Sequence, residues 1–230
     1  MPLTYYYKTS PIGRYLAATQ VNSPKMDVAL VGLGIGAIAS YARPGDNYTY
    51  FELDPAVIKL ASDSTLFKFV HGCKGNLKIV EGDARLTLRH ANPDSLDLIV
   101  LDAFSSDAIP LHLISLEAIR EYLSKLKPDG VLAFHISNRF LDLGRILAGA
   151  ADELGLVGRL GDDTDMTDDE EREGKSVSRW FFLSRTDEAF VPFRKSPFLT
   201  TIDDQPRLKP WTDDRSNLLD AWDFNLGGNR

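Results

Sequence analysis

Cysteine is nearly absent from this chain, which has Cys73 alone among its 230 residues. A single thiol cannot close an intramolecular disulfide, and it cannot build a thiolate metal cluster. The histidines are also few and lack the spacing of metal ligands: His71, His90, His112 and His135. The sequence therefore predicts no metal site, and the fold has to rest on a hydrophobic core.

Long hydrophobic runs are absent as well. No stretch of about twenty apolar residues is present, so no segment of this chain is expected to span a bilayer. The first residues, MPLTYYYKTSPIGRY, lack the apolar core of a secretory signal peptide. A cytoplasmic location is the resulting expectation.

Positive charge is in deficit, because 26 Lys and Arg residues face 33 Asp and Glu residues and leave a formal net charge of −7. This balance argues against a nucleic-acid partner, whose phosphates would be repelled. It mildly favours a cationic substrate, although acidic proteins are common and the charge mainly aids solubility.

The chain is long enough for one large domain, and its hydrophobic content of 43% is ordinary for a globular protein. We expect an N-terminal β-hairpin in residues 1–22, since tyrosines at 5–7 suit a strand and Ser-Pro-Ile-Gly at 10–13 suits a turn. An α/β domain is expected in residues 23–230. Its expected strands are 27–32, 47–52, 77–81, 97–102, 130–136 and 178–184, and its expected helices are 36–42, 55–62, 84–91, 113–126, 141–154 and 214–222.

Two of these strands indicate the kind of sheet. Residues 28–31 and 98–101 are continuous apolar runs, which are typical of strands buried on both faces of a parallel sheet. Residues 162–175 are strongly acidic and are interpreted as a solvated surface loop in preference to a functional lid.

The most informative segment is DVALVGLGIGAIASYARPGDNYTYFELD at residues 27–54. It combines an apolar strand, a glycine loop (32–36), a short helix and a second strand that ends in Glu52. Glycines allow a backbone to lie against a ligand, and a helix N-terminus offers free N–H groups. Glu52 lies twenty positions after Gly32, where a carboxylate can accept the hydroxyls of a ribose. The segment predicts a nucleoside-containing cofactor, although a dinucleotide site or a tight packing turn has the same spacing.

Three further carboxylates follow strand ends: Asp83, Asp102 and Asp107. In an open parallel sheet, ligands bind outside the carboxyl ends of the strands. We therefore expect these acids to converge with Glu52 and the glycine loop on one crevice. The alternative is that each Asp only caps the helix that follows it.

The order of these motifs resembles the class I S-adenosylmethionine-dependent methyltransferase fold, and more narrowly the spermidine synthase family. That family carries Asp-Ser-Ser-Asp-Pro after its fourth strand, and the matching stretch here is DAFSSDAIP at 102–110, with two extra residues between the acids. The segments TYYYKTSPIGR, GDARL, FHISNR and PWTDDRSNLL resemble spermidine synthase-like domains that often follow a membrane-embedded half in bacterial proteins. The resemblance covers residues 4–222 and implies a Rossmann-like, mostly parallel, seven-stranded α/β sheet.

The resemblance also implies a role for each motif residue. The implied cofactor-binding residues are Gly32, Gly34 and Gly36 against the nucleoside and its sulfur-bearing chain, Glu52 on the ribose, and Asp83 with Ala84 on the adenine. Asp102 matches the acid that handles the attacking amine, and Asp107 matches the second acid of that loop, so these two are the implied catalytic residues. Family members usually have Gly-Gly-Gly-Asp-Gly, whose Asp helps to hold the donor's amine, and Ile35 stands in its place here.

Other residues near the strand ends carry weaker predictions. His135 and Asn138-Arg139 close the fifth expected strand, and His135 is interpreted as a hydrogen-bonded strand-end histidine in preference to a catalytic one. Tyr5–Tyr7, Phe104 and Trp211 are suited either to wall a pocket or to fill the core.

The implied activity is transfer of an aminopropyl or other alkyl group from an S-adenosyl sulfonium to an amine. The donor is S-adenosylmethionine or its decarboxylated form, the product is S-adenosylhomocysteine or methylthioadenosine, and no metal takes part. The alternatives are an S-adenosylmethionine-dependent methyltransferase and a non-catalytic nucleoside-binding regulatory domain. The expected partner is a small cationic amine, with no nucleic acid and no membrane segment in this chain, and a homodimer is left open.

Overall fold

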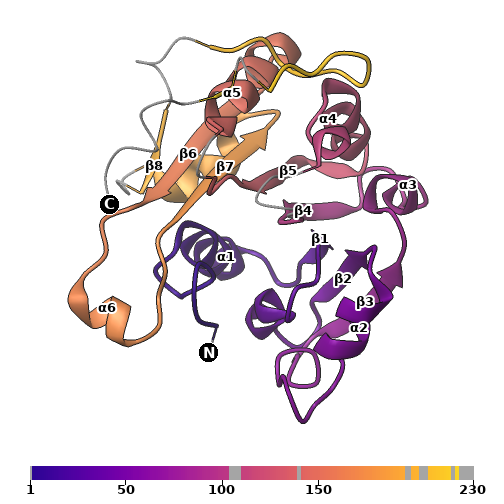
Figure 1. Ribbon diagram of the computed structural model, residues 1–230, viewed down its shortest axis with the longest axis vertical. Coiled ribbons are helices and arrows are strands. Elements are labelled where there is room, and N and C mark those ends of the chain that lie inside the picture. The colour runs from indigo at the N-terminus through magenta and orange to yellow at the C-terminus, as the bar shows by residue number, and fades with distance from the viewer. Residues whose placement is uncertain are drawn as a thin grey trace.

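An eight-stranded sheet with the order β3-β2-β1-β4-β5-β7-β6-β8 forms the centre of the computed structural model (Figure 1). The structure describes residues 2–103, 110–138, 141–194, 198–201, 207–218 and 221–222. The strands are β1 (Asp27–Val31), β2 (Asn47–Glu52), β3 (Asn76–Glu81), β4 (Leu96–Leu101), β5 (Leu126–His135), β6 (Val157–Asp163), β7 (Ser178–Ser184) and β8 (Leu199–Thr200).

Pairing is parallel from β3 through β2, β1 and β4 to β5, and antiparallel from β5 through β7 and β6 to β8. The predicted α/β sheet is therefore confirmed. The sheet has eight strands where the resemblance implied seven, and the short β8 has only two residues. The strand β6 occupies residues for which the sequence pattern predicted no strand.

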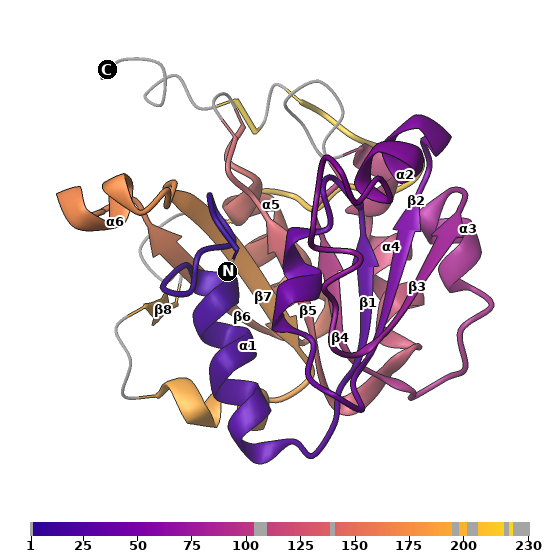
Figure 2. The ribbon, with the colours of Figure 1, turned by 90° about the horizontal axis from the view of Figure 1, so that it is seen from below.

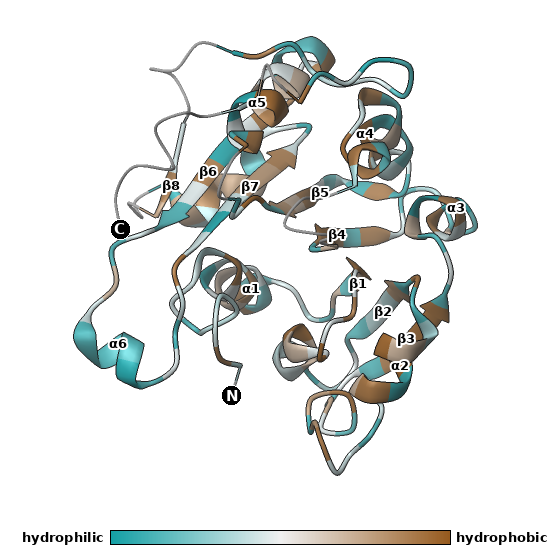
Figure 3. Ribbon diagram, in the orientation of Figure 1, coloured by the Kyte–Doolittle hydropathy of each residue, from teal (hydrophilic) through white to brown (hydrophobic). Residues whose placement is uncertain are grey.

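Helices cover both faces of this sheet (Figures 1 and 2). One face carries α1 (Pro11–Asn22), η1 (Ala37–Tyr41), α2 (Pro55–Ala61) and η3 (Asp187–Phe193). The other carries α3 (Ala84–Leu88), η2 (Leu111–Leu113), α4 (Leu116–Leu123) and α5 (Leu143–Leu154). The short helix α6 (Asp168–Arg172) lies away from the sheet, and Figure 3 shows it as hydrophilic.

Alternation along the central strands supplies both halves of the core. In β4, Leu98 and Val100 join the cluster under α1, whereas Ile99 and Leu101 join the cluster under α4 and α5. Successive side chains of a strand point to opposite faces, so a continuous apolar run fits a strand covered on both sides. The interpretation of these runs as buried strands is confirmed.

The predicted N-terminal hairpin is wrong, because residues 11–22 form the helix α1. Ser10 is its N-cap and accepts a hydrogen bond from the Gly13 backbone N–H, and Pro11 occupies the first turn, where it loses no helical hydrogen bond. Ile12, Tyr15 and Leu16 follow at helical spacing and are buried. Capping and helical periodicity therefore outweigh the strand propensity of the tyrosines before them.

Three further expectations need correction. Residues 36–42 contain a five-residue 3₁₀ helix, η1, in place of an α-helix. The acidic segment 162–175 is not wholly a loop, since it holds α6 with a capping box between Thr167 and Glu170. The predicted closing helix is wrong in its described part, where Thr212 and Arg215 pair in a tight turn. Within the described ranges, the helices are too short or too polar to cross a membrane.

Candidate active site

A cleft of about 500 Å³ opens at the carboxyl ends of the parallel strands, a size suited to a small-molecule ligand. It lies where the chain order reverses, since β1 sits between β2 and β4, and open α/β sheets bind ligands at this point. Six of the eight predicted site residues line it: Gly32, Gly34, Glu52, Asp83, Ala84 and Asp102. Their convergence was predicted from the strand ends; their individual roles stay predictions.

The glycine loop is built so that only glycine fits at its ends. Gly32, Gly34 and Gly36 all have positive φ angles, of 91°, 50° and 78°. A Cβ on Gly32 would lie 2.5 Å from the carbonyl oxygen of Asp102, whereas a Cβ on Gly34 would meet no atom within 4 Å. Gly36 is not among the residues that line the cleft, and a Cβ there would lie 2.8 Å from the Val70 side chain. Gly34 is therefore the glycine whose missing side chain leaves open space in the cleft.

Glu52, at the end of β2, is locked to this loop. One carboxylate oxygen accepts the Leu33 backbone N–H at 2.8 Å, and the other accepts the Asp54 N–H at 2.9 Å. A carboxylate has about four acceptor positions, so both oxygens retain capacity for a ligand's hydroxyls. The predicted ribose-binding acid is thus fixed in place beside the glycine loop.

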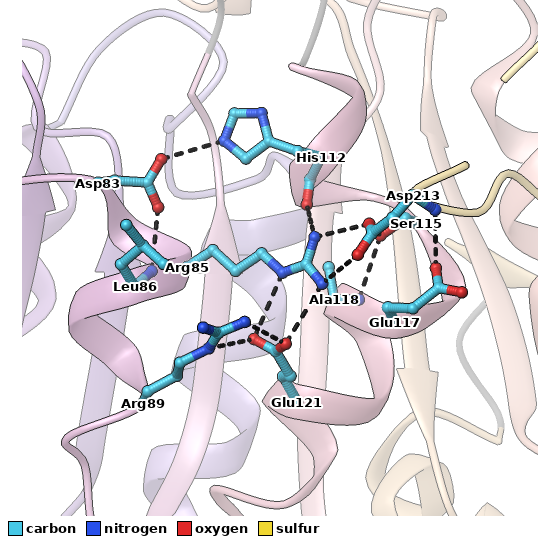
Figure 4. A network of polar contacts seen from close by, with 10 residues as sticks. All are labelled: Asp83, Arg85, Leu86, Arg89, His112, Ser115, Glu117, Ala118, Glu121 and Asp213. Atoms are coloured by element: carbon cyan, nitrogen blue, oxygen red, sulfur yellow. Dashed lines mark hydrogen bonds and ion pairs between the residues drawn. The ribbon is translucent and has the colours of Figure 1, made fainter. Parts of the chain in front are cut away.

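Asp83 has two partners within the protein. Its Oδ1 accepts the Leu86 N–H and caps α3, and its Oδ2 lies 3.2 Å from His112 Nε2 (Figure 4). Asp83 therefore caps a helix and also lines the cleft. His112, on η2, also lines the cleft and was not singled out from the sequence.

Arg85, on α3, ties this wall to the C-terminal segment (Figure 4). Its guanidinium donates to the backbone oxygen of His112, to Glu121 on α4 and to Asp213. The pKa of Asp213 is lowered to about 2, mainly by the hydrogen bonds from Arg85. Arg85 thereby holds the His112 backbone at the cleft, and Glu121 and Asp213 hold the Arg85 guanidinium in place.

Asp102, directly after β4, faces His135 at the end of β5. Asp102 Oδ1 and His135 Nδ1 are 2.7 Å apart, and each side chain is only 5% exposed. Burial raises the pKa of Asp102, and the neighbouring His135 acts in the opposite direction. The prediction that His135 is a hydrogen-bonded strand-end histidine is confirmed, and its partner is the predicted catalytic acid.

Tyr5, in the N-terminal segment, lines the cleft. Its ring stacks on His135 with centroids 4.5 Å apart, and both burial and the charge of Asp102 raise its pKa. The segment is anchored by the Thr4 N–H, which donates to the Gly174 oxygen at 2.7 Å. Of the other aromatic residues considered from the sequence, Trp211 packs into the core. Phe104 lies outside the described residues, as do Arg139 and the predicted catalytic residue Asp107.

The described walls of the cleft are acidic. Glu52, Asp54, Asp83 and Asp102 line it, and neither Lys nor Arg is found among the described lining residues. Over the described ranges, no group of three or more His, Cys, Asp or Glu side chains is arranged to hold a metal ion. Carboxylates at this density attract positively charged ligands.

No protein-family model matches the chain. A curated polyamine aminopropyltransferase of Vibrio vulnificus (strain CMCP6) is 31% identical over 136 residues, which cover 56% of this chain and 43% of that protein. A probable spermidine synthase from Corynebacterium glutamicum ATCC 13032 superposes with a TM-score of 0.55 at 19% identity, over 74% of this chain and 62% of that one. A precorrin-6y C5,15-methyltransferase from Geobacter metallireducens GS-15 superposes with a TM-score of 0.50 at 16% identity, over 77% of this chain and 90% of that one.

The sheet order, the cleft and these likenesses define a protein with the class I methyltransferase fold. Within that class, the sequence similarity of the chain to a polyamine aminopropyltransferase agrees with the spermidine synthase resemblance of the motifs. The match spans less than half the length of the curated relative, at 43%. The activity of that whole protein is therefore a matter for proposal.

Proposed function

We propose that this chain transfers an alkyl group, in the first place an aminopropyl group, from an S-adenosyl sulfonium donor to a small cationic amine. The observation that carries the proposal is the acidic cleft, in which carboxylates lie at the carboxyl ends of three parallel strands: Glu52 at the end of β2, Asp83 after β3 and Asp102 after β4. A sulfonium and a polyamine are both cations, so such a cleft suits both substrates.

The residues on the donor side fit an S-adenosyl nucleoside. Gly34 leaves open space, Glu52 presents oxygens fixed by two backbone N–H groups, and Asp83 and Ala84 form the wall assigned to the adenine. The donor, when bound, supplies an electrophilic carbon attached to sulfur. The likeness to the Vibrio vulnificus polyamine aminopropyltransferase supports this class of donor.

Asp102 can accept the proton that the attacking amine has to lose. An ammonium group has no lone pair with which to attack carbon, so it must first lose a proton. Asp102 is buried at the cleft wall, and its pKa is raised by that burial, which makes its carboxylate a better proton acceptor than an exposed one. We assign to Asp102 the acceptance of this proton and the orientation of the amine.

A methyltransferase is the second candidate, and Ile35 is the observation that favours it. Ile35 stands where the related enzymes carry the acid that helps to hold the amine of decarboxylated S-adenosylmethionine, and its side chain is 41% exposed. Without that acid, the site should favour decarboxylated S-adenosylmethionine less strongly over S-adenosylmethionine itself. A methyl group rather than an aminopropyl group would then be transferred.

Product formation by mass spectrometry separates these candidates. The purified chain is incubated with either donor and a panel of diamines and polyamines. An alkylated amine together with methylthioadenosine supports aminopropyl transfer, whereas a methylated product together with S-adenosylhomocysteine supports the second candidate. Tight binding of methylthioadenosine with no product from either donor contradicts both and favours a nucleoside-binding regulatory domain.

A further inference from the structure

His135 lies at the centre of a layered arrangement next to the cleft. Its ring is stacked between Tyr5, with centroids 4.5 Å apart, and Trp180, with centroids 4.7 Å apart. Strand pairing explains the second contact, because His135 of β5 lies opposite Trp180 of β7. Two aromatic faces fix the plane of the imidazole and keep water from it.

The two ring nitrogens of His135 have different partners. Nδ1 lies 2.7 Å from Asp102 Oδ1, and Nε2 lies 2.9 Å from Ser137 Oγ. Ser137 Oγ already accepts the Arg179 backbone N–H at 2.9 Å, and its own hydroxyl hydrogen is available to Nε2. This pattern favours the neutral tautomer in which Nδ1–H donates to Asp102 and Nε2 accepts from Ser137.

We propose that His135 is a positioning residue that holds Asp102 as an ionised proton acceptor, with Oδ1 bound and Oδ2 left for the substrate amine. The inference rests on the proposed function for its catalytic part. It adds a residue that neither the motifs nor the cleft walls assigned, since His135 acts through Asp102 from behind the cleft wall.

Burial and charge set the direction of the expected pH effect. Burial raises the pKa of Asp102, and its contact with His135 lowers it. The other titratable groups around Asp102 are Tyr5 above His135 and four residues of the cleft wall: Glu52, Asp54, Asp83 and His112. Removal of the His135 donor should therefore raise the pKa of Asp102, and the acidic limb of kcat/KM should move to higher pH.

Two substitutions separate the donor from the stacked ring. His135→Phe keeps a ring between Tyr5 and Trp180 but has no N–H, whereas His135→Asn keeps an N–H donor but loses the ring. We expect His135→Phe to lower kcat by about a hundredfold, to shift the acidic limb upward by about one pH unit, and to leave methylthioadenosine affinity nearly unchanged. We expect His135→Asn to recover at least about tenfold of that loss, with the acidic limb close to that of the wild type.

The inference is overturned if His135→Phe retains wild-type turnover and pH dependence, or if both variants are equally impaired with unmoved acidic limbs. NMR on the unliganded protein gives a readout that needs no activity. ¹⁵N shifts of His135 should show a protonated Nδ1 and an unprotonated Nε2, and the ¹³C titration of Asp102 should move to higher pH in His135→Phe. A wild type without turnover that shows these shifts refutes the proposed function alone. A ring protonated at Nε2, or at both nitrogens across the tested pH range, refutes the inference, and this readout holds even if a variant fails to fold.

Discussion

Arg85 in α3 donates to both carboxylate oxygens of Asp213, which lies 128 residues further along the chain, with N–O distances of 2.7 and 2.8 Å. Such a two-pronged contact is more directional than a single ion pair. The same guanidinium holds the backbone of His112 at the cleft wall (Figure 4). The contact thus links the C-terminal segment to the candidate active site.

Asp213→Asn should destabilise the fold modestly at neutral pH, and this effect should disappear at strongly acidic pH. The Asp213 side chain is 42% exposed, so solvent screening limits the expected loss to about 0.5–1 kcal/mol at pH 7. Its pKa is lowered from 3.8 to about 2 in the folded protein, so its stabilisation is present above pH 4 and is lost as the pH falls toward 2. Urea unfolding at several pH values measures this difference.

Asp214→Asn is the matched control, because Asp214 is the exposed neighbour in the same turn. It should change the unfolding free energy little at any pH. Equal effects of the two substitutions would show that net charge, rather than the contact with Arg85, stabilises this segment.

Glu52→Ala should weaken the binding of methylthioadenosine by about tenfold or more, since each charge-assisted hydrogen bond to a ribose hydroxyl contributes about 1.5–3 kcal/mol. The substitution also frees the Leu33 N–H, which loosens the glycine loop. Titration calorimetry measures the change. Glu81→Ala is the control, because Glu81 pairs with Glu52 across β2 and β3 but is exposed outside the cleft. Unchanged affinity in Glu52→Ala would falsify its assignment to the ribose.

Gly34→Ala should block the nucleoside site without clashing within the protein. Gly34 and Gly155 both have left-handed backbones, with φ of 50° and 65°, and a Cβ on either would meet no atom within 4 Å. Each substitution to Ala should therefore cost a similar amount of stability, about 1–2 kcal/mol. Only Gly34→Ala should lose methylthioadenosine affinity, because Gly34 lines the cleft whereas Gly155 caps α5. Equal affinities in the two variants would mean that the ligand does not approach this loop.

The sheet was predictable because its signal is local and repeated. Continuous apolar runs such as 98–101 are typical of strands covered on both faces, and acids at the carboxyl ends of parallel strands meet at one edge of the sheet. The hairpin prediction failed because three tyrosines outweighed the capping signal of Ser10 and Pro11. The helical spacing of Ile12, Tyr15 and Leu16, which follow the cap, is the local signal that favours the helix.

The contacts of the site depend on pairings that no local pattern contains. The stacking of His135 with Tyr5 and Trp180 joins residues from the N-terminal segment, β5 and β7. His112 contacts Asp83 through its ring and Arg85 through its backbone oxygen, which lies 27 residues from Arg85 along the chain. The sequence indicated which acids converge, whereas their partners follow from the register of strands distant along the chain.

Ile35→Asp should change the choice of donor. The wild type should prefer decarboxylated S-adenosylmethionine over S-adenosylmethionine by less than about a hundredfold, which corresponds to about 2.7 kcal/mol. An aspartate at this position should bind the amine of the decarboxylated donor and raise that preference by about tenfold, the equivalent of 1.4 kcal/mol. Competition between the two donors in one assay measures the ratio directly. A wild-type preference above a hundredfold would show that another acid already serves this amine.

Asp102→Asn should distinguish an enzyme from a binding domain. The amide is nearly the same size and its oxygen can still accept from His135 Nδ1, so the fold and the binding of methylthioadenosine should persist. The amide cannot take up a proton and carries no negative charge for the amine, so turnover should fall by about 10²–10⁴-fold. Thermal unfolding and calorimetry establish that the variant is folded and binds the nucleoside, and mass spectrometry of the alkylated amine gives the rate. If the variant matches the wild type in turnover, Asp102 is a structural partner of His135 and the proton is accepted elsewhere. If the wild type itself forms no product while it binds the nucleoside tightly, the cleft is a ligand sensor and the acid at the end of β4 serves recognition alone.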